Sequence, residues 1–254
     1  MHWQAMASTA ERFRSGRIFI AGDAAHVMPP TGGWGGNVGV QDAHNLAWKL
    51  GLVLEGVADP TLLASYEDER RPVAELTVEQ AYTRYVLRTD PSIPRDRMQP
   101  LVHDLDVELG YVYDSAAIVR GMTSEGPPHL SPRESRGLPG TRAPHHWLER
   151  DGRQISTLDL IERNFTLLAA EGAGKWCDIA HDASRQVGVG LSVYQIGASG
   201  LEDPTGEFPR AYGLTRSGCV LIRPDGFIAW RQVDDAPASV SRVRTVLERL
   251  LCRT

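Results

Sequence analysis

The feature that most constrains the fold is the stretch AGDAAHVMPPTGGWGGNVGVQDAHNLAWKL, residues 21–50. It places eight glycines and prolines between an apolar run, residues 18–21, and a segment with apolar residues at helical spacing. The run predicts a short buried strand, and the segment predicts a helix with one apolar stripe facing a core. That stripe comprises Ala43, Leu46, Ala47, Leu50, Val53, Leu54 and Val57. A strand, a glycine-rich turn and a helix in this order favour an α/β fold.

The glycine-rich turn also predicts a ligand site. Glycines remove side chains, so backbone N–H groups can approach a flat or anionic ligand closely. The helix N-terminus beyond the turn carries about half a positive charge, which favours a negatively charged partner. Asp23 stands at the carboxyl end of the predicted strand, where its carboxylate can accept hydrogen bonds from ligand hydroxyls. The alternative is a plain connector in which Asp23 caps the helix, and composition alone does not separate the two interpretations.

Residues 16–50, followed by LLASYEDERRPVA, resemble the second flavin-contacting motif and the following helices of the FAD-dependent aromatic hydroxylases, the group A flavoprotein monooxygenases. The resemblance implies that Asp23 binds a ribityl hydroxyl of FAD and that the backbone at residues 36 and 37 meets the pyrimidine edge of the flavin. The cofactor-binding residues it implies are Gly22, Asp23, Pro30, Gly32, Gly33, Gly35, Gly36 and Asn37. It assigns no catalytic acid or base. Trp34 either shields one flavin face or packs on the helix.

Two further helices are expected in the N-terminal region, one starting near Pro60 and one after Pro72, with a bend at the second proline. Four charged residues of the first of these helices are expected to form structural ion pairs that hold it against the flavin domain, rather than a catalytic set. They are Glu67, Glu69, Arg70 and Arg71. The sequence contains no GxGxxG fingerprint, because Val38, Cys177 and Val193 occupy the third glycine position after its GxG pairs. The half of the site that binds AMP and pyrophosphate is therefore expected outside this sequence. A fragment, a truncated reading frame and half of a split enzyme all remain open.

The second half of the chain has a different pattern. FTLLAA and LSVYQIG predict strands around a helical stretch, GCVLIRPDGFIAWR predicts a hairpin at Pro224-Asp225-Gly226, and residues 240–251 predict a closing helix. The stretches LGYVYDSAAIV, GLPGTRAPHHWL and ISTLDLI resemble the connection to a C-terminal thioredoxin-like domain in the phenol hydroxylase and aromatic polyketide hydroxylase branch. Cys177 lacks a second cysteine at CxxC spacing, so thiol exchange is not expected.

These patterns predict an α/β protein with a partial FAD-binding domain followed by a thioredoxin-like α/β domain. The expected boundaries are residues 1–120 for the C-terminal part of the FAD-binding monooxygenase domain, 121–152 for a Pro/Gly-rich linker and 153–254 for the thioredoxin-like domain. The three cysteines and eight histidines lack the spacing of a metal site, so no metal is expected.

The resemblance implies that the complete enzyme uses FAD and NADPH or NADH to hydroxylate an aromatic small molecule, with polyketide-derived rings one such class. The isolated chain is expected to be inactive without a missing N-terminal half, and a homodimer is compatible with the sequence. The alternative function is a catalytically silent binding or association module that keeps the flavin-type turn. A net charge of −5 with scattered Lys and Arg argues against nucleic-acid or membrane partners. Without an apolar run of about 18 residues or a signal-peptide pattern, the chain is expected to be cytoplasmic.

Overall fold

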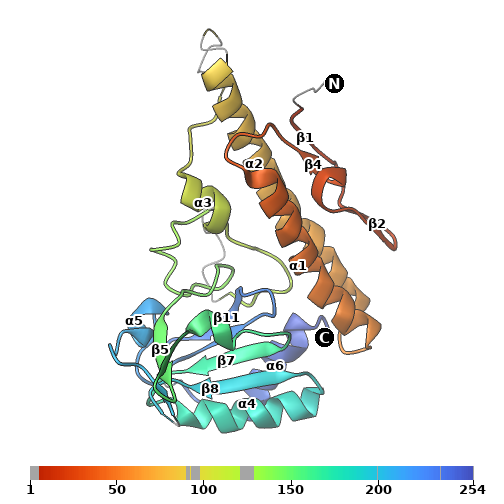
Figure 1. Ribbon diagram of the computed structural model, residues 1–254. Helices are drawn as coiled ribbons and strands as arrows, with labels where there is room; N and C mark the ends of the chain where they lie inside the picture. Colours follow the sequence, from red (N-terminus) through yellow and green to blue (C-terminus); the bar gives the residue numbers. More distant parts are fainter. Residues whose placement is uncertain are drawn as a thin grey trace.

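The structure is a computed structural model of the 254-residue chain and describes residues 6–89, 92, 98–120, 129–198, 200–234 and 236–253. A pair of long helices, α1 and α2, stands on a four-stranded sheet that is backed by two further helices (Figure 1). This arrangement of a helix pair followed by a C-terminal α/β domain confirms the predicted α/β fold class.

The N-terminal part consists of the helix pair and small strands beside it. Its elements are β1 (Ser8–Thr9), β2 (Arg14–Ser15), β3 (Ile18–Phe19), η1 (Gly22–Ala24), β4 (His26–Val27), α1 (Trp34–Leu54), η2 (Pro60–Leu63), α2 (Ala64–Thr89) and α3 (Asp104–Leu109). β1 pairs with β4 and β2 with β3, both antiparallel. The prediction of a buried strand at 18–21 is wrong, because β3 is two residues long and Ile18 is 70% exposed. Among the described residues β3 pairs with β2 alone, which leaves that side chain uncovered.

The helices differ from prediction at two points. Helix α1 begins at Trp34, inside the glycine-rich stretch, so Gly35 and Gly36 lie in its first turn. Helix α2 runs unbroken through Pro72, where the sequence predicted a bend between two helices. Pro72 is exposed, so the carbonyl of residue 68, which loses its helical N–H partner, can be hydrated.

The apolar stripe predicted on and beyond α1 is buried only in part. Ala43 and Ala47 are exposed, and Leu54 is 80% exposed. The buried residues of α1 are Trp34, Val38, Asp42, Asn45 and Lys49. Three of these five are polar, and their partners lie on α2 and in the C-terminal domain. Leu46, Val53 and Val57 of the stripe are half-buried and pack against the hydrophobic clusters, so the prediction holds for these residues only.

The C-terminal part confirms the predicted order of strand, helix, strand, hairpin and helix. Its elements are β5 (Trp147–Arg150), β6 (Arg153–Ser156), η4 (Thr157–Leu160), β7 (Phe165–Ala169), α4 (Gly174–Val187), β8 (Leu191–Gln195), β9 (Leu201–Glu202), α5 (Phe208–Ala211), β10 (Cys219–Ile222), β11 (Ile228–Gln232) and α6 (Val240–Leu250). The four-stranded sheet has the order β11-β10-β7-β8, with β7 and β8 parallel and the other pairs antiparallel. This is the strand order of a thioredoxin-like sheet. Helices α4 and α6 pack on each other and into its core.

One hydrophobic cluster spans the two parts. Trp48 of α1 packs edge-on against Phe165 of β7, with ring centroids 5.8 Å apart, and the backbone N–H of Asp59 donates to the carbonyl of Leu251 at 2.9 Å. Residues 129–146, expected as part of a linker, are hydrogen-bonded to the sheet; Gly140, for example, donates to the carbonyl of Ile228 at 2.8 Å. Residues 121–128 of that expected linker lie outside the described residues.

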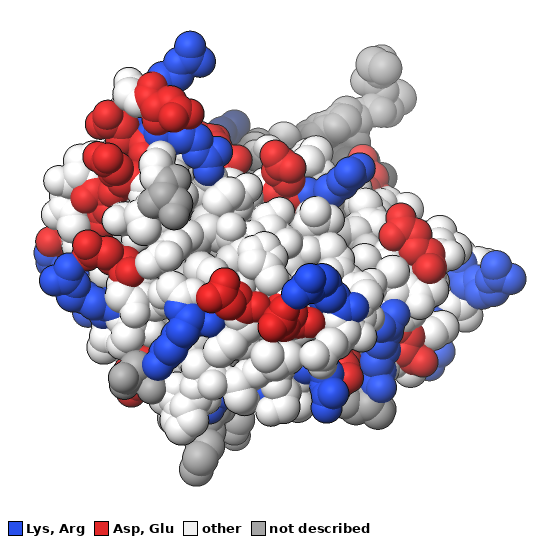
Figure 2. All heavy atoms as spheres, turned by 90° about the horizontal axis from the view of Figure 1, so that it is seen from below, with Lys and Arg blue, Asp and Glu red and all other residues white. Residues whose placement is uncertain are grey.

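On the face shown in Figure 2, acidic and basic side chains are interspersed over a largely uncharged surface. Among the described residues, no helix has both the length and the apolar character needed to cross a membrane.

Candidate functional site

The predicted ligand residues lie together where η1 meets the start of α1. The turn containing Gly22 packs against α1 so closely that a Cβ on Gly39 would sit 3.1 Å from the Cα of Gly22. Gly22 has a φ of 59°, a conformation that favours glycine. The other predicted residues surround this contact, from the loop before α1 and from its first turn: Pro30, Gly32, Gly33, Gly35, Gly36 and Asn37. Each of the eight predicted residues is exposed or half-buried, so they form an open surface.

The N-terminus of α1 opens onto this surface. Its N-cap, Gly33, has a φ of 69°, and no side chain caps the helix. The first N–H groups of a helix have no intrahelical partner, so this 21-residue helix presents free donors and its positive dipole end. A Cβ at Gly33 or Gly36 would meet no atom within 4 Å, so space remains beside the backbone there. The Asp23 carboxylate is also exposed and makes no hydrogen bond or ion pair to the residues that the structure describes. Asp23 therefore does not act as the cap considered as its alternative role.

Trp34 is a packing residue. It is 2% exposed, its Nε1–H donates to Glu108 at 3.0 Å, and the guanidinium of Arg84 lies 4.6 Å from its ring centroid. A Cβ on Gly32 would lie 2.6 Å from the indole ring, so Gly32 is needed for the loop to pass over Trp34. The indole thus supports the loop from beneath.

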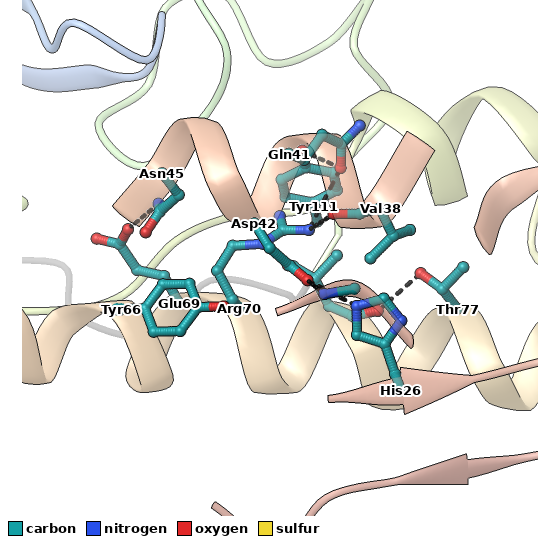
Figure 3. Close-up of polar contacts among 12 residues, drawn as sticks. His26, Val38, Gln41, Asp42, Asn45, Tyr66, Glu69, Arg70, Thr77 and Tyr111 are labelled. Atoms are coloured by element: carbon teal, nitrogen blue, oxygen red, sulfur yellow. Dashed lines mark hydrogen bonds and ion pairs between the residues drawn. The ribbon is translucent and has the colours of Figure 1, made fainter. Parts of the chain in front are cut away.

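A buried carboxylate, Asp42 on α1, binds His26 and Arg70 (Figure 3) and also the backbone of Gly22. The Gly22 backbone N–H donates to its Oδ2 at 3.1 Å, and His26 Nε2 lies 2.7 Å from the same oxygen. Arg70 of α2 donates from Nε to Oδ1 at 2.7 Å. Burial alone would raise the pKa of Asp42, but the hydrogen bonds from His26 and Arg70 and the charge of Arg70 hold that pKa below its ordinary value. Asp42 is therefore an anion that fixes the turn, α1 and α2 relative to one another.

Glu69 is the centre of a second buried cluster. Its carboxylate accepts hydrogen bonds from Asn45 at 2.6 Å and Lys49 at 2.8 Å on α1, and two from Arg223, at 2.6 and 2.9 Å. Burial would raise the pKa of Glu69, whereas the charges of Arg223 and Lys49 hold it well below its ordinary value. Arg223 also pairs with Asp225, so two cations face two anions with every side chain essentially buried.

The structure confirms the expected ion pairs for Glu69 and Arg70 but not for every member of the predicted set. Glu67 accepts the backbone N–H groups of Phe13 and Arg14, and Arg71 pairs with Glu75 on the exposed side of α2. Asp42, Asn45 and Lys49 are structural residues that the sequence patterns did not predict. Their signal is a polar stripe at i, i+3 and i+7, which is helical spacing.

A groove of about 1410 Å³ lies apart from the surface formed by the predicted ligand residues. It is lined by the C-terminal half of α1, by residues 130–145 and by the C-terminal domain. None of the eight predicted ligand residues lines it. The described residues also contain no group of three or more His, Cys, Asp or Glu side chains arranged to hold a metal ion.

Comparison with known proteins gives two domain matches. Residues 1–81 match the family of FAD binding domains, and residues 136–254 match the C-terminal domain of aromatic-ring hydroxylases. The chain is 48% identical over 256 aligned residues to 4-methyl-5-nitrocatechol 5-monooxygenase of a Burkholderia species, covering 99% of this chain and 47% of that protein. It is 42% identical to tetracenomycin A2 monooxygenase-dioxygenase of Streptomyces glaucescens, covering 99% of this chain and 44% of that protein.

The solved structures give the same result. The crystal structure of aklavinone-11 hydroxylase in a ternary complex with FAD and aklavinone superposes with a TM-score of 0.93 and 40% identity, covering 99% of this chain and 46% of that one. The chain thus spans about half the length of the relatives it matches.

Proposed function

Because residues 1–81 match FAD binding domains and residues 136–254 match the C-terminal domain of aromatic-ring hydroxylases, we propose that the chain provides the flavin-ring side of the FAD site in a monooxygenase that hydroxylates an aromatic ring. The observation that carries the proposal is the juxtaposition of the Gly22-Asp23 turn with the uncapped, glycine-rich start of α1. The activities of these relatives, on a nitrocatechol and on tetracenomycin, support phenolic or polyketide-derived rings as the substrate class.

The residues present fit one half of FAD. An exposed carboxylate without a partner among the described residues suits a polyol hydroxyl, and uncapped N–H groups beside open space suit the electron-rich pyrimidine edge of a flavin. The sequence has no GxGxxG for the pyrophosphate. We propose that a strand, turn and helix bearing this fingerprint act together with the chain, on the same polypeptide or another, and that NADPH or NADH is the reductant.

The cofactor would supply the redox chemistry, reduction by a nicotinamide and oxygen transfer to the ring. The chain's own residues bind, orient and exclude water. Asp23 accepts a hydrogen bond from the ribityl chain, and the N–H groups at residues 36 and 37 place positive potential at the flavin edge. Asp42 and Trp34 hold these groups in place, so the donors are aligned before the ligand binds.

The test is a chimera that joins the N-terminal half of the Burkholderia relative to this chain, assayed for bound FAD and for NAD(P)H oxidation. The isolated chain should be colourless, whereas the chimera should be yellow and its NADPH oxidation should respond to aromatic more than to aliphatic compounds. Stoichiometric FAD and NADPH oxidation by the isolated chain would contradict the need for a second half. A folded chimera without FAD would contradict the function itself and favour a silent binding module.

Asp23→Ala tests the site within that chimera. Loss of a hydrogen bond to a charged group should weaken FAD binding by about 1 to 3 kcal/mol, roughly 5- to 150-fold in Kd by titration. Asp178→Ala, which removes an exposed carboxylate on α4, is the matched control and should leave the Kd unchanged. Equal Kd values for wild type and Asp23→Ala would remove Asp23 from the site.

A further inference from the structure

The turn between β10 and β11 inserts two charged residues of the C-terminal domain into the helix pair. Arg223 is fully buried and Asp225 is 4% exposed. Arg223 holds both carboxylate oxygens of Glu69 on α2, and Asp225 accepts a hydrogen bond from Asn45 on α1 at 3.2 Å. The hairpin thus contacts both long helices through buried, directional hydrogen bonds.

A second contact connects the hairpin to α2 through stacked aromatic rings. Phe227, at the end of the same turn, stacks on Tyr113 with ring centroids 4.0 Å apart and planes 25° from parallel. The hydroxyl of Tyr113 accepts a hydrogen bond from Arg70 at 2.9 Å. The hairpin therefore contacts Glu69 directly through Arg223 and Arg70 indirectly through Tyr113. Because Glu69 and Arg70 are consecutive in α2, these contacts determine the position of both.

These two residues in turn set the position of the Gly22 turn. Glu69 binds Asn45 and Lys49 of α1, while Arg70 binds Asp42, whose other oxygen accepts the Gly22 N–H. A continuous series of buried contacts therefore runs from the hairpin to the backbone beside Asp23. We propose that the thioredoxin-like domain positions the Gly22-Asp23 turn, with Arg223 as the positioning residue. The consequence for FAD rests on the proposed function, whereas the effect on the turn does not.

Arginine is specifically required at this position. Its planar guanidinium donates to Glu69 from both terminal nitrogens and to Asp225 from Nε and Nη2, so it orients two carboxylates at once. A lysine keeps the charge but cannot make this pair of bidentate contacts. Arg223→Lys therefore removes the orientation while leaving the cluster electrically neutral.

The experiment is hydrogen–deuterium exchange of the full chain, measured by mass spectrometry on a peptide covering residues 20–27. The Gly22 amide is protected by Asp42, so Arg223→Lys should increase exchange in this peptide by at least about threefold, with peptides from β7 and α6 unchanged. The matched control is Arg216→Lys, which alters the exposed Arg216–Glu171 pair of the same domain and should have no effect. Asp225→Asn is the second variant, for use if Arg223→Lys does not fold.

Unchanged exchange at residues 20–27, or an equal increase in all peptides, overturns the proposal, because a purely structural Arg223 would lower stability without singling out the turn. In the chimera, Arg223→Lys should also change the visible circular dichroism of the bound flavin and should be non-additive with Asp42→Asn in FAD Kd. A wild-type chimera that binds no FAD refutes the proposed function, while the exchange result still decides this inference.

Discussion

Raising the pH from 7 to 9 should stabilise this protein through Lys49, which is an unusual direction for a buried charge cluster. Lys49 is fully buried on α1, and the groups that face it are Glu69 of α2, Asn45 of α1, and Arg223 and Asp225 of the hairpin. Burial lowers the pKa of its ammonium group from 10.5 to about 8, and the nearby charge of Arg223 adds to this, although Glu69 opposes it.

The sign follows from proton binding in the two states. Between pH 8 and 10.5 the unfolded chain still binds the Lys49 proton while the folded chain has released it, so stability rises with pH across this window. The full difference in pKa corresponds to about 3 kcal/mol, and at pH 9 to a gain of about 1 kcal/mol. Below pH 8 the folded protein retains the charge, and this group contributes no pH dependence.

The assay is urea unfolding followed by tryptophan fluorescence at pH 7 and pH 9, for wild type and Lys49→Met. Methionine keeps the apolar stem and leaves Glu69 paired with Arg223, Asn45 and Ser115. The change in unfolding free energy from pH 7 to pH 9 should be more favourable in wild type by about 1 kcal/mol. Other titrating groups are common to both proteins and cancel in the comparison. Identical pH dependence in the two proteins would refute the assignment of the titration to Lys49.

Two further predictions concern the turn and the domain boundary. Gly39→Ala should push the Gly22 turn away from α1, since the added Cβ would lie 3.1 Å from the Gly22 Cα, and should weaken FAD binding by the chimera several-fold; an unchanged Kd would show that the turn tolerates the shift. A fragment of residues 136–254 should be more stable in urea than one of 153–254, because only the longer piece keeps β5 and the hydrogen bonds of residues 140–143 to the hairpin. Equal urea midpoints for the two fragments would support the domain boundary at residue 153 that the sequence predicts.

The elements that the sequence predicts well are those determined by local patterns. In the C-terminal domain, apolar runs for β7, β8, β10 and β11 alternate with amphipathic segments, and the Pro224-Asp225-Gly226 turn has residues suited to its backbone angles. The glycine-rich turn could likewise be placed at an exposed helix start from its composition. These features depend on neighbours within a few residues.

Features that depend on distant partners were mispredicted. Periodicity marked Leu54 and Ala47 as core because they are apolar. The buried residues are instead Asp42, Asn45 and Lys49, because Arg70 pairs with Asp42 and Glu69 binds both Asn45 and Lys49. A further partner of Asn45, Asp225, lies 180 residues away in the chain. Pro72 failed to break α2 for a related reason, because its exposed side lets water replace the missing hydrogen bond.

In the thioredoxin-like domain the hairpin, rather than the start of α4, makes the buried charged contact with another part of the chain. In thioredoxin-like enzymes a reactive cysteine at the helix N-terminus is activated by a lowered pKa. Here burial, assisted by the charge of Asp178, raises the pKa of Cys177 to about 11, so its thiol stays protonated at neutral pH. The opposite situation holds at the hairpin, where Arg223 and Asp225 are buried against another part of the chain and joined to it by paired charges. The hairpin therefore joins the thioredoxin-like domain to the two long helices, through which we propose that it positions the turn that bears Asp23.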